Sequence, residues 1–69
     1  MNYRELTRKS RRLGCEFDRM AKGDHEIWIN TANRGRTTIP NWRGKDLKAG
    51  TIGGILRDLD ISRHEFDQS

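Results

Sequence analysis

The chain has only 69 residues, close to the lower limit at which one hydrophobic core is self-sufficient, which leaves no room for a nucleotide-binding fold or a second domain. We therefore expect one domain over residues 1–69, with a short polar tail from about residue 67. The chain carries 14 Lys and Arg against 10 Asp and Glu, and this net charge of +4 favours polyanionic partners, nucleic acid first among them.

The cysteine and histidine content argues against a metal site and against a disulfide. Cys15 is the only cysteine, and His25 and His64 lie far apart in the sequence with no cysteine cluster near either. We expect no metal and no cofactor. Because no apolar run approaches the length of a membrane span and the first residues show no apolar signal region, a cytoplasmic protein is expected.

The first predicted element is a short amphipathic helix that ends at Gly14, a residue typical of helix stops. Its narrow apolar face consists of four residues at helical spacing, Tyr3, Leu6, Ser10 and Leu13. Basic residues occupy the remaining surface, namely Arg4, Arg8, Lys9, Arg11 and Arg12. We interpret the cluster of Arg8, Arg11 and Arg12 as a solvated helix face, and a contact with a partner protein there is the alternative.

Two strands joined by a turn are predicted next. Residues 15–20 alternate, with Cys15 and Phe17 on one side of the strand. The turn at residues 21–24 leads into a second strand over residues 25–31, with Ile27 and Ile29 on one face. His25 is the first residue of this strand.

A third strand is predicted over residues 36–40. The tight connection before it, at residues 33–35, contains an Asn and a Gly that can take positive φ. Thr37 and Ile39 share a face of this strand, and Pro40 closes it because proline cannot donate to a ladder.

A polar, basic loop over residues 41–46 precedes a second helix that begins at about Ala49. Its apolar face is the clearest in the sequence and consists of Ile52, Ile55, Leu56 and Leu59. Gly53 and Gly54 interrupt it at a cost of about 1 kcal/mol each relative to alanine, and a close approach of helix and sheet is one explanation for them. Ser62 and Glu65 then form a capping box, with Ile61 and Phe66 as its hydrophobic staple, and begin a final turn of helix.

This order predicts a two-layer α+β sandwich, α-β-β-β-α, with a three-stranded antiparallel sheet and both helices on one face. Double-stranded RNA-binding domains have the same order and reach phosphates from the start of their last helix and from neighbouring loops. The corresponding segment here holds four candidate RNA-binding residues, Trp42, Arg43, Lys45 and Lys48. It leads into a helix N-terminus, whose free backbone N–H groups bind anions.

The turn at residues 22–24 delivers His25 to the start of a strand. Histidine both takes and gives a proton near neutral pH, so His25 is the candidate general acid or base. By strand parity His25 shares a face with Ile27 and Ile29, so a hydrogen-bonded histidine at the edge of the core is the alternative interpretation. Lys22, in the same turn, is a candidate phosphate ligand.

Together these motifs resemble the HicA toxins of bacterial and archaeal toxin–antitoxin modules, which are small messenger-RNA endoribonucleases. The resemblance covers nearly everything from Tyr3 to Phe66 and rests on RLG at 12–14, KGDHEIW at 22–28, RTTIP at 36–40, GKDLKAGT at 44–51 and IS at 61–62. It implies a fold like a double-stranded RNA-binding domain and a catalytic histidine in the glycine-x-histidine turn, which is His25 here. It also implies neutralisation by a HicB-type antitoxin, with a monomeric free toxin and a hetero-oligomeric complex. An antitoxin contact is then the alternative to a solvated face for the arginine cluster of the first helix.

The chain departs from the family pattern at three positions. Asp24 stands where many relatives carry serine, so a carboxylate replaces a hydroxyl donor beside His25. Ala49 stands where many relatives have proline, and Asp60 replaces the usual glycine that ends the second helix, which weakens the C-cap.

The resulting hypothesis is a metal-independent endoribonuclease toxin in which His25 transfers a proton. Phosphate contacts would come from Lys22 and from one or more of Arg43, Lys45 and Lys48, while Trp42 either stacks on a base or packs over the sheet edge. No second proton-transfer residue is evident, because Glu26 points to the opposite strand face and His64 lies in the tail. The alternative is a non-catalytic RNA-binding module in which His25 only orders the turn. DNA binding is disfavoured because no recognition-helix pattern is present.

Overall fold

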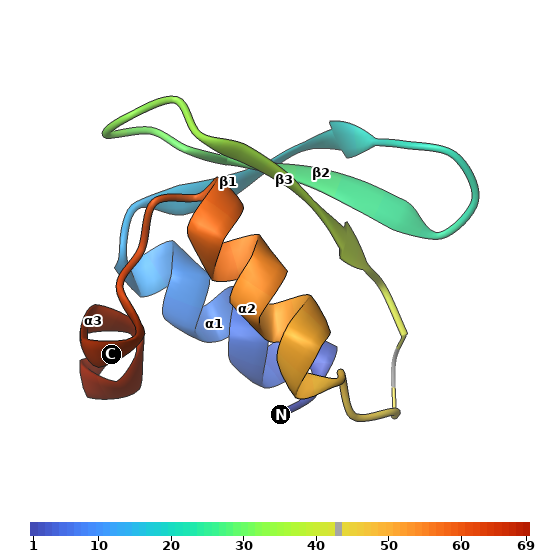
Figure 1. Cartoon of the computed structure of the whole chain (residues 1–69). Coiled ribbons are helices and arrows are strands. Elements are labelled where there is room, and N and C mark those ends of the chain that lie inside the picture. Colours follow the sequence, from blue (N-terminus) through green and yellow to red (C-terminus); the bar gives the residue numbers. More distant parts are fainter. Residues whose placement is uncertain (43) are drawn as a thin grey trace.

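The protein forms two layers, a three-stranded antiparallel sheet and a layer of helices that covers one face of it (Figure 1). The computed structural model describes residues 1–42 and 44–69. The elements follow in the order α1 (Tyr3–Arg12), β1 (Cys15–Met20), β2 (His25–Asn30), β3 (Arg36–Pro40), α2 (Ala49–Asp58) and α3 (Arg63–Gln68). This is the α+β, α-β-β-β-α arrangement like that of double-stranded RNA-binding domains, followed by one further short helix.

Helix α1 begins and ends as its sequence predicts. The side chain of Asn2 caps it by accepting a hydrogen bond from the Glu5 amide at 3.0 Å, which satisfies one of the free donors of the first turn. Leu6 and Ser10 are fully buried against the core. Gly14 takes φ +92°, a left-handed conformation that favours glycine and ends the helix.

The sheet has the order β1-β2-β3, and a bulge in the edge strand β1 alters the predicted alternation. Cys15 pairs with Asn30 and Phe17 with Trp28, but the register shifts between Phe17 and Arg19. The Phe17 ring meets the Trp28 indole edge to face at 6.4 Å between centroids, yet Phe17 remains 44% exposed at the edge of the sheet. Cys15, by contrast, is buried in the core.

The inward face of β2 consists of Glu26, Trp28 and Asn30, while Ile27 and Ile29 face outward and are only half-buried. Only one face of the sheet is covered by helices (Figure 1), and Trp28, among the largest fully buried side chains of the described residues, lies on that face. Trp28 therefore takes the core, with its N–H bonded to Glu26. The alternative interpretation of His25 as a core-edge residue is wrong, because its face is the open one.

The connection between β2 and β3 differs from the predicted turn. Arg34, rather than Asn33 or Gly35, takes positive φ, at +63°. Asn33 stabilises the turn through its side chain, which accepts from the Gly35 amide at 2.7 Å and donates to the Leu59 carbonyl at 3.2 Å. Gly35 is required for another reason: a Cβ there would lie 2.6 Å from the Asp58 carbonyl oxygen.

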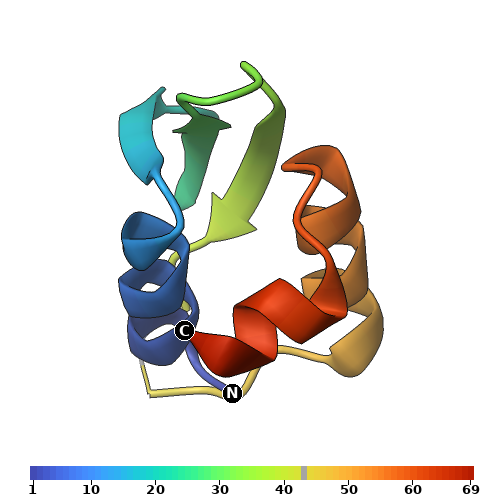
Figure 2. The same cartoon turned by 90° about the vertical axis from the view of Figure 1, so that its left-hand side faces the viewer.

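Helix α2 buries its predicted apolar face, and Ile52, Ile55, Leu56 and Leu59 all belong to the core. Asp60 follows it in the left-handed region, at φ +56°, where the family's glycine would be unstrained. Helix α3 begins with the predicted capping box of Ser62 and Glu65, buries Phe66 completely, and extends to Gln68, beyond the predicted start of the tail. It lies across the ends of α1 and α2 (Figure 2).

Close packing does not explain the glycines of α2. A Cβ at Gly53 would meet nothing within 4 Å, and one at Gly54 would meet only the flexible end of Arg57 at 3.8 Å. Replacing Gly53 by alanine should therefore raise the free energy of unfolding by about 1 kcal/mol, through the entropy that glycine loses in a helix. Urea denaturation measures this change.

Gly35→Ala is the matched control. It should lower the free energy of unfolding by roughly 1–3 kcal/mol, because the added methyl group meets backbone rather than solvent. A loss of stability in Gly53→Ala would show that α2 needs its glycine for backbone conformation.

Candidate nucleic-acid interface around His25

The turn that carries His25 is held from both sides by backbone hydrogen bonds. Gly23 takes φ +69°, and the His25 amide donates to the Lys22 carbonyl at 3.4 Å while the Ala21 amide donates to the His25 carbonyl at 2.8 Å. The Asn41 amide donates to the Asp24 carbonyl at 3.0 Å, so the residue after β3 is tied to this turn. His25 thus has a defined backbone position at the end of β2, opposite Pro40.

The His25 imidazole stands on the face of the sheet that no helix covers, and its side chain is 46% exposed. Its Nδ1 lies 3.4 Å from Oδ1 of Asp24, whose side chain is 54% exposed. A carboxylate at this distance attracts a proton on Nδ1. The other ring nitrogen, Nε2, is then the one left for a substrate.

The residue that follows His25 in the sequence carries a buried carboxylate. Glu26 is 6% exposed, and its Oε1 accepts from the Tyr3 hydroxyl at 2.6 Å and from the Trp28 indole N–H at 2.9 Å. Its Oε2 accepts from the Asn41 side-chain amide at 2.9 Å. Glu26 therefore points away from the imidazole, as strand parity predicts, and joins α1, β2 and the segment after β3. The spacing of Glu26 and Trp28 on one strand face signals their contact, whereas nothing in the sequence signals Tyr3 or Asn41.

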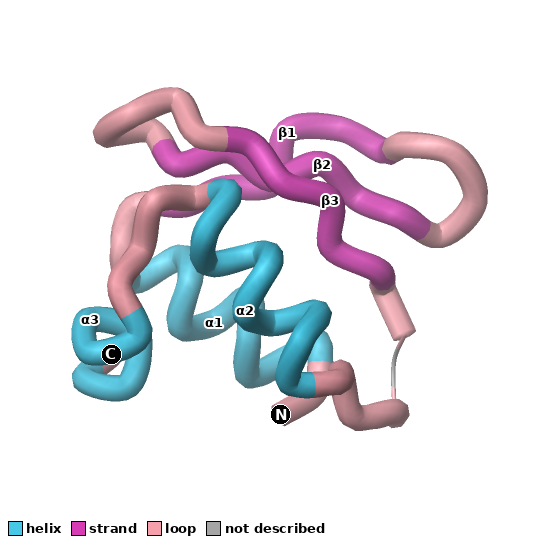
Figure 3. The backbone as a smooth tube through the Cα atoms, viewed as in Figure 1, coloured by secondary structure: helices cyan, strands magenta, loops and turns pink. Residues whose placement is uncertain are grey.

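The predicted RNA-binding residues fall into two groups. Lys22 is exposed in the His25 turn, and Trp42, 42% exposed, directly follows Asn41, which is bonded to that turn. Lys45 and Lys48 are exposed farther along, where the Leu47 amide donates to the Met1 carbonyl and Asp46 bridges to Asn2. Arg43 lies outside the described residues. The turn and the loop before α2 occupy the same side of the molecule (Figure 3).

The remaining titratable candidates stay apart from this region. Burial raises the pKa of the Cys15 thiol and favours its neutral form, so Cys15 is a core residue rather than a nucleophile. His64 is exposed on α3, at the opposite end of the molecule from the His25 turn (Figure 1). Among the described residues, no three His, Cys, Asp or Glu side chains are grouped so that they could hold a metal ion.

The Glu26 contacts predict a large effect of its removal. Glu26→Ala takes the acceptor away from three donors on three different elements, and we expect the free energy of unfolding to fall by about 3 kcal/mol or more. Glu16→Ala, which removes an exposed carboxylate from β1, should change it by less than about 0.5 kcal/mol. Equal effects of the two substitutions in chemical denaturation would contradict a structural role for the buried carboxylate.

Comparison with known proteins identifies the family. No curated protein and no solved structure matches the chain significantly. In the described part of the chain, no helix has the length and apolar character needed to cross a membrane. The model of one family, described as the HicA toxin of bacterial toxin–antitoxin systems, matches residues 3–61. The chain therefore belongs to the HicA toxin family, whose members pair with an antitoxin protein.

Proposed function

We propose that this toxin is a metal-independent endoribonuclease that cleaves messenger RNA and so inhibits translation, with His25 as its general acid or base. The observation that carries the proposal is the position of the imidazole. It is held at a strand end by backbone bonds on both sides, yet it stands on the open face and packs into no core. Such a side chain contributes little to stability and is available to a substrate.

The proposed reaction needs no covalent enzyme intermediate. The ribose 2′-oxygen attacks the adjacent phosphorus as its proton leaves, the P–O5′ bond breaks, and the departing 5′-oxygen takes up a proton. His25 carries one of these two proton transfers, a role typically worth 10²–10⁴-fold. Lys22 lies in the same turn and stabilises the negative charge that develops on the phosphorane oxygens.

Asp24 orients the imidazole in this proposal. By attracting the proton to Nδ1, its carboxylate leaves Nε2 as the nitrogen that exchanges a proton with the RNA. The role resembles that of the carboxylate that holds a catalytic histidine in one tautomer in other hydrolases. Asp24 would thus replace the serine of many relatives as a positioning residue.

The RNA is bound, in this proposal, by Lys22, Trp42, Lys45 and Lys48, together with Arg43. The exposure of Trp42 favours stacking on a base over packing at the sheet edge.

The antitoxin is of the HicB type and presents an acidic surface to this cationic region, giving fast and salt-sensitive association. The free toxin is a monomer in the cytoplasm, and the two proteins form a hetero-oligomer.

His25→Ala should abolish RNA cleavage in the presence of a chelator, and growth arrest in cells at equal expression. The free energy of unfolding should change by less than about 0.5 kcal/mol, because the imidazole is exposed. His64→Ala, the other histidine, should cleave like the wild type. If the wild-type protein binds RNA without cleaving it, the non-catalytic RNA-binding module is the correct function instead.

Asp24→Ala should lower the cleavage rate by about tenfold, part of the 10²–10⁴-fold that one proton transfer contributes. Asp24→Asn should retain more activity, since its amide oxygen still accepts from Nδ1–H. Nitrogen-15 NMR of the neutral imidazole separates orientation from a merely structural effect. We expect the Nδ1–H tautomer in the wild type and the Nε2–H tautomer in Asp24→Ala. The same tautomer in both proteins would exclude Asp24 as the orienting group.

A further inference from the structure

A groove of about 740 Å³ runs along the outer side of α1, away from the contacts that the proposed function uses. Helix α1 forms one wall of the groove. Gly44, in the loop between β3 and α2, lines the other, and this loop passes the N-terminal end of α1 (Figure 2). The residues that line the groove are almost all polar or cationic: Asn2, Tyr3, Arg4, Thr7, Arg8, Arg11, Arg12 and Gly44.

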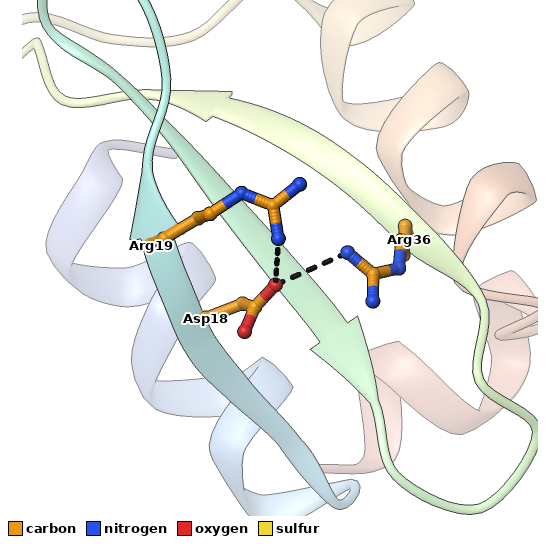
Figure 4. Close-up of polar contacts among 3 residues, drawn as sticks. All are labelled: Asp18, Arg19 and Arg36. Atoms are coloured by element: carbon orange, nitrogen blue, oxygen red, sulfur yellow. Dashed lines mark hydrogen bonds and ion pairs between the residues drawn. The ribbon is translucent and has the colours of Figure 1, made fainter.

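The arginines of this groove keep their charge unneutralised. Within residues 1–42 and 44–69, none of the four forms an ion pair, and no carboxylate lines the groove. The outer face of the sheet is different, because Arg19 and Arg36 each donate to the same Asp18 oxygen at 3.1 Å (Figure 4). Helix α1 therefore presents four arginines whose charge no ion pair offsets in the described structure.

The spacing of these arginines suits a nucleic acid backbone. Arg4, Arg8 and Arg12 follow one another at four-residue intervals, which corresponds to a rise of about 6 Å from each to the next. This is close to the distance between successive phosphates of one strand. Guanidinium groups also bind phosphate oxygens in a bidentate geometry that lysine lacks.

Arg11 is held in place without losing its charge. Its guanidinium carbon lies 5.0 Å from the centre of the Trp28 ring, a cation–π contact that orients the side chain over the edge of the core. Because Trp28 is fully buried and bonded to Glu26, this arginine has a rigid support. The side-chain entropy that it gives up on binding an anion is correspondingly smaller.

Hydrogen bonds link two residues of the groove to the region around His25. Tyr3 lines the groove, and its hydroxyl donates a hydrogen bond to Glu26, the residue after His25 in β2. Gly44 lines its other side and belongs to the loop of Trp42 and Lys45, whose backbones are hydrogen-bonded at 3.2 Å. The N-terminal end of the groove is therefore the end that lies beside the loop of Trp42 and Lys45.

We propose that this groove binds the phosphate backbone of the RNA, with Arg4, Arg8 and Arg12 on successive phosphates of one strand and Arg11 beside them. The proposal rests on the proposed function and extends its RNA surface from the loops onto α1, in place of the solvated helix face predicted from the sequence. An acidic antitoxin is the other candidate occupant. The groove lacks the apolar centre of protein–protein interfaces, since Tyr3 is the only aromatic or aliphatic side chain of any size among the described residues that line it.

The test compares two charge-matched double variants of the full chain, both with His25→Ala so that the RNA stays intact. Arg4→Gln with Arg8→Gln removes two groove arginines, while Arg34→Gln with Arg57→Gln removes two exposed arginines elsewhere that also lack ion pairs in the described structure. Glutamine keeps the helix propensity of arginine, so α1 stays folded. Binding of an unstructured RNA oligonucleotide is measured over a range of salt concentrations.

The groove variant should bind RNA roughly a hundredfold more weakly, because each of its two lost charge-assisted contacts costs on the order of one decade in affinity. The slope of log K against log salt should fall in magnitude by about 1.4, or about 0.7 for each single-strand phosphate that the variant no longer neutralises, while the control slope stays unchanged. Equal binding by the two variants overturns the proposal. So does unchanged RNA binding combined with weaker antitoxin binding, which assigns the groove to the protein partner. Since the assay measures binding without cleavage, its outcome does not depend on whether His25 is catalytic.

Discussion

The buried carboxylate of Glu26 is the contact on which the arrangement of this small protein depends. A carboxylate removed from water is tolerated only where donors satisfy its oxygens. Here the donors come from α1, from β2 and from the segment after β3, so one side chain joins the two layers to the loop. Because alternate residues of a strand face opposite ways, inward-facing Glu26 and Trp28 require His25 to face outward. The exposure of the imidazole is thus a consequence of core construction.

The arginines of this protein differ in whether a carboxylate pairs with them. On the outer face of the sheet, Asp18 binds two arginines and offsets one of their two positive charges. Along α1, in the described part of the chain, no carboxylate forms an ion pair with Arg4, Arg8, Arg11 or Arg12, and these arginines line a groove. Four unpaired arginines therefore place positive charge along one groove of a chain whose net charge is +4.

The element order was predictable because local signals agree with one another, from the helix stop at Gly14 to the Ser62–Glu65 capping box. The buried face of β2 was not. Alternation identifies two faces of a strand, but the choice between them depends on Tyr3 and Asn41, which are 23 and 15 residues away from Glu26. Similarly, Arg34 takes the left-handed position because Asn33 bonds the end of α2, a contact invisible in the sequence.

The candidate site shows the same limit. The position of His25 at the start of a strand was predictable from its turn and from the family resemblance. Its contact with Asp24 joins two residues that are adjacent in the sequence. The arginines on α1 were visible as a basic helix face, but a helix face becomes a groove only when a distant segment lies beside it. That segment, at Gly44, is separated from α1 by the entire sheet in the sequence.

The two ends of the sandwich are built differently, which bears on how such a toxin can diversify. At the end away from His25, Asn30 and Asn33 both donate to the Leu59 carbonyl, Thr37 donates to Asp58, and Gly35 leaves no room for a larger residue. These contacts hold the end of α2 against the sheet. Around His25, apart from the buried contact of Glu26 with Asn41, the side chains of Lys22, Asp24 and Trp42 are exposed, and their replacement leaves the core untouched. Substrate preference can therefore drift during evolution at one end while the other keeps the fold intact.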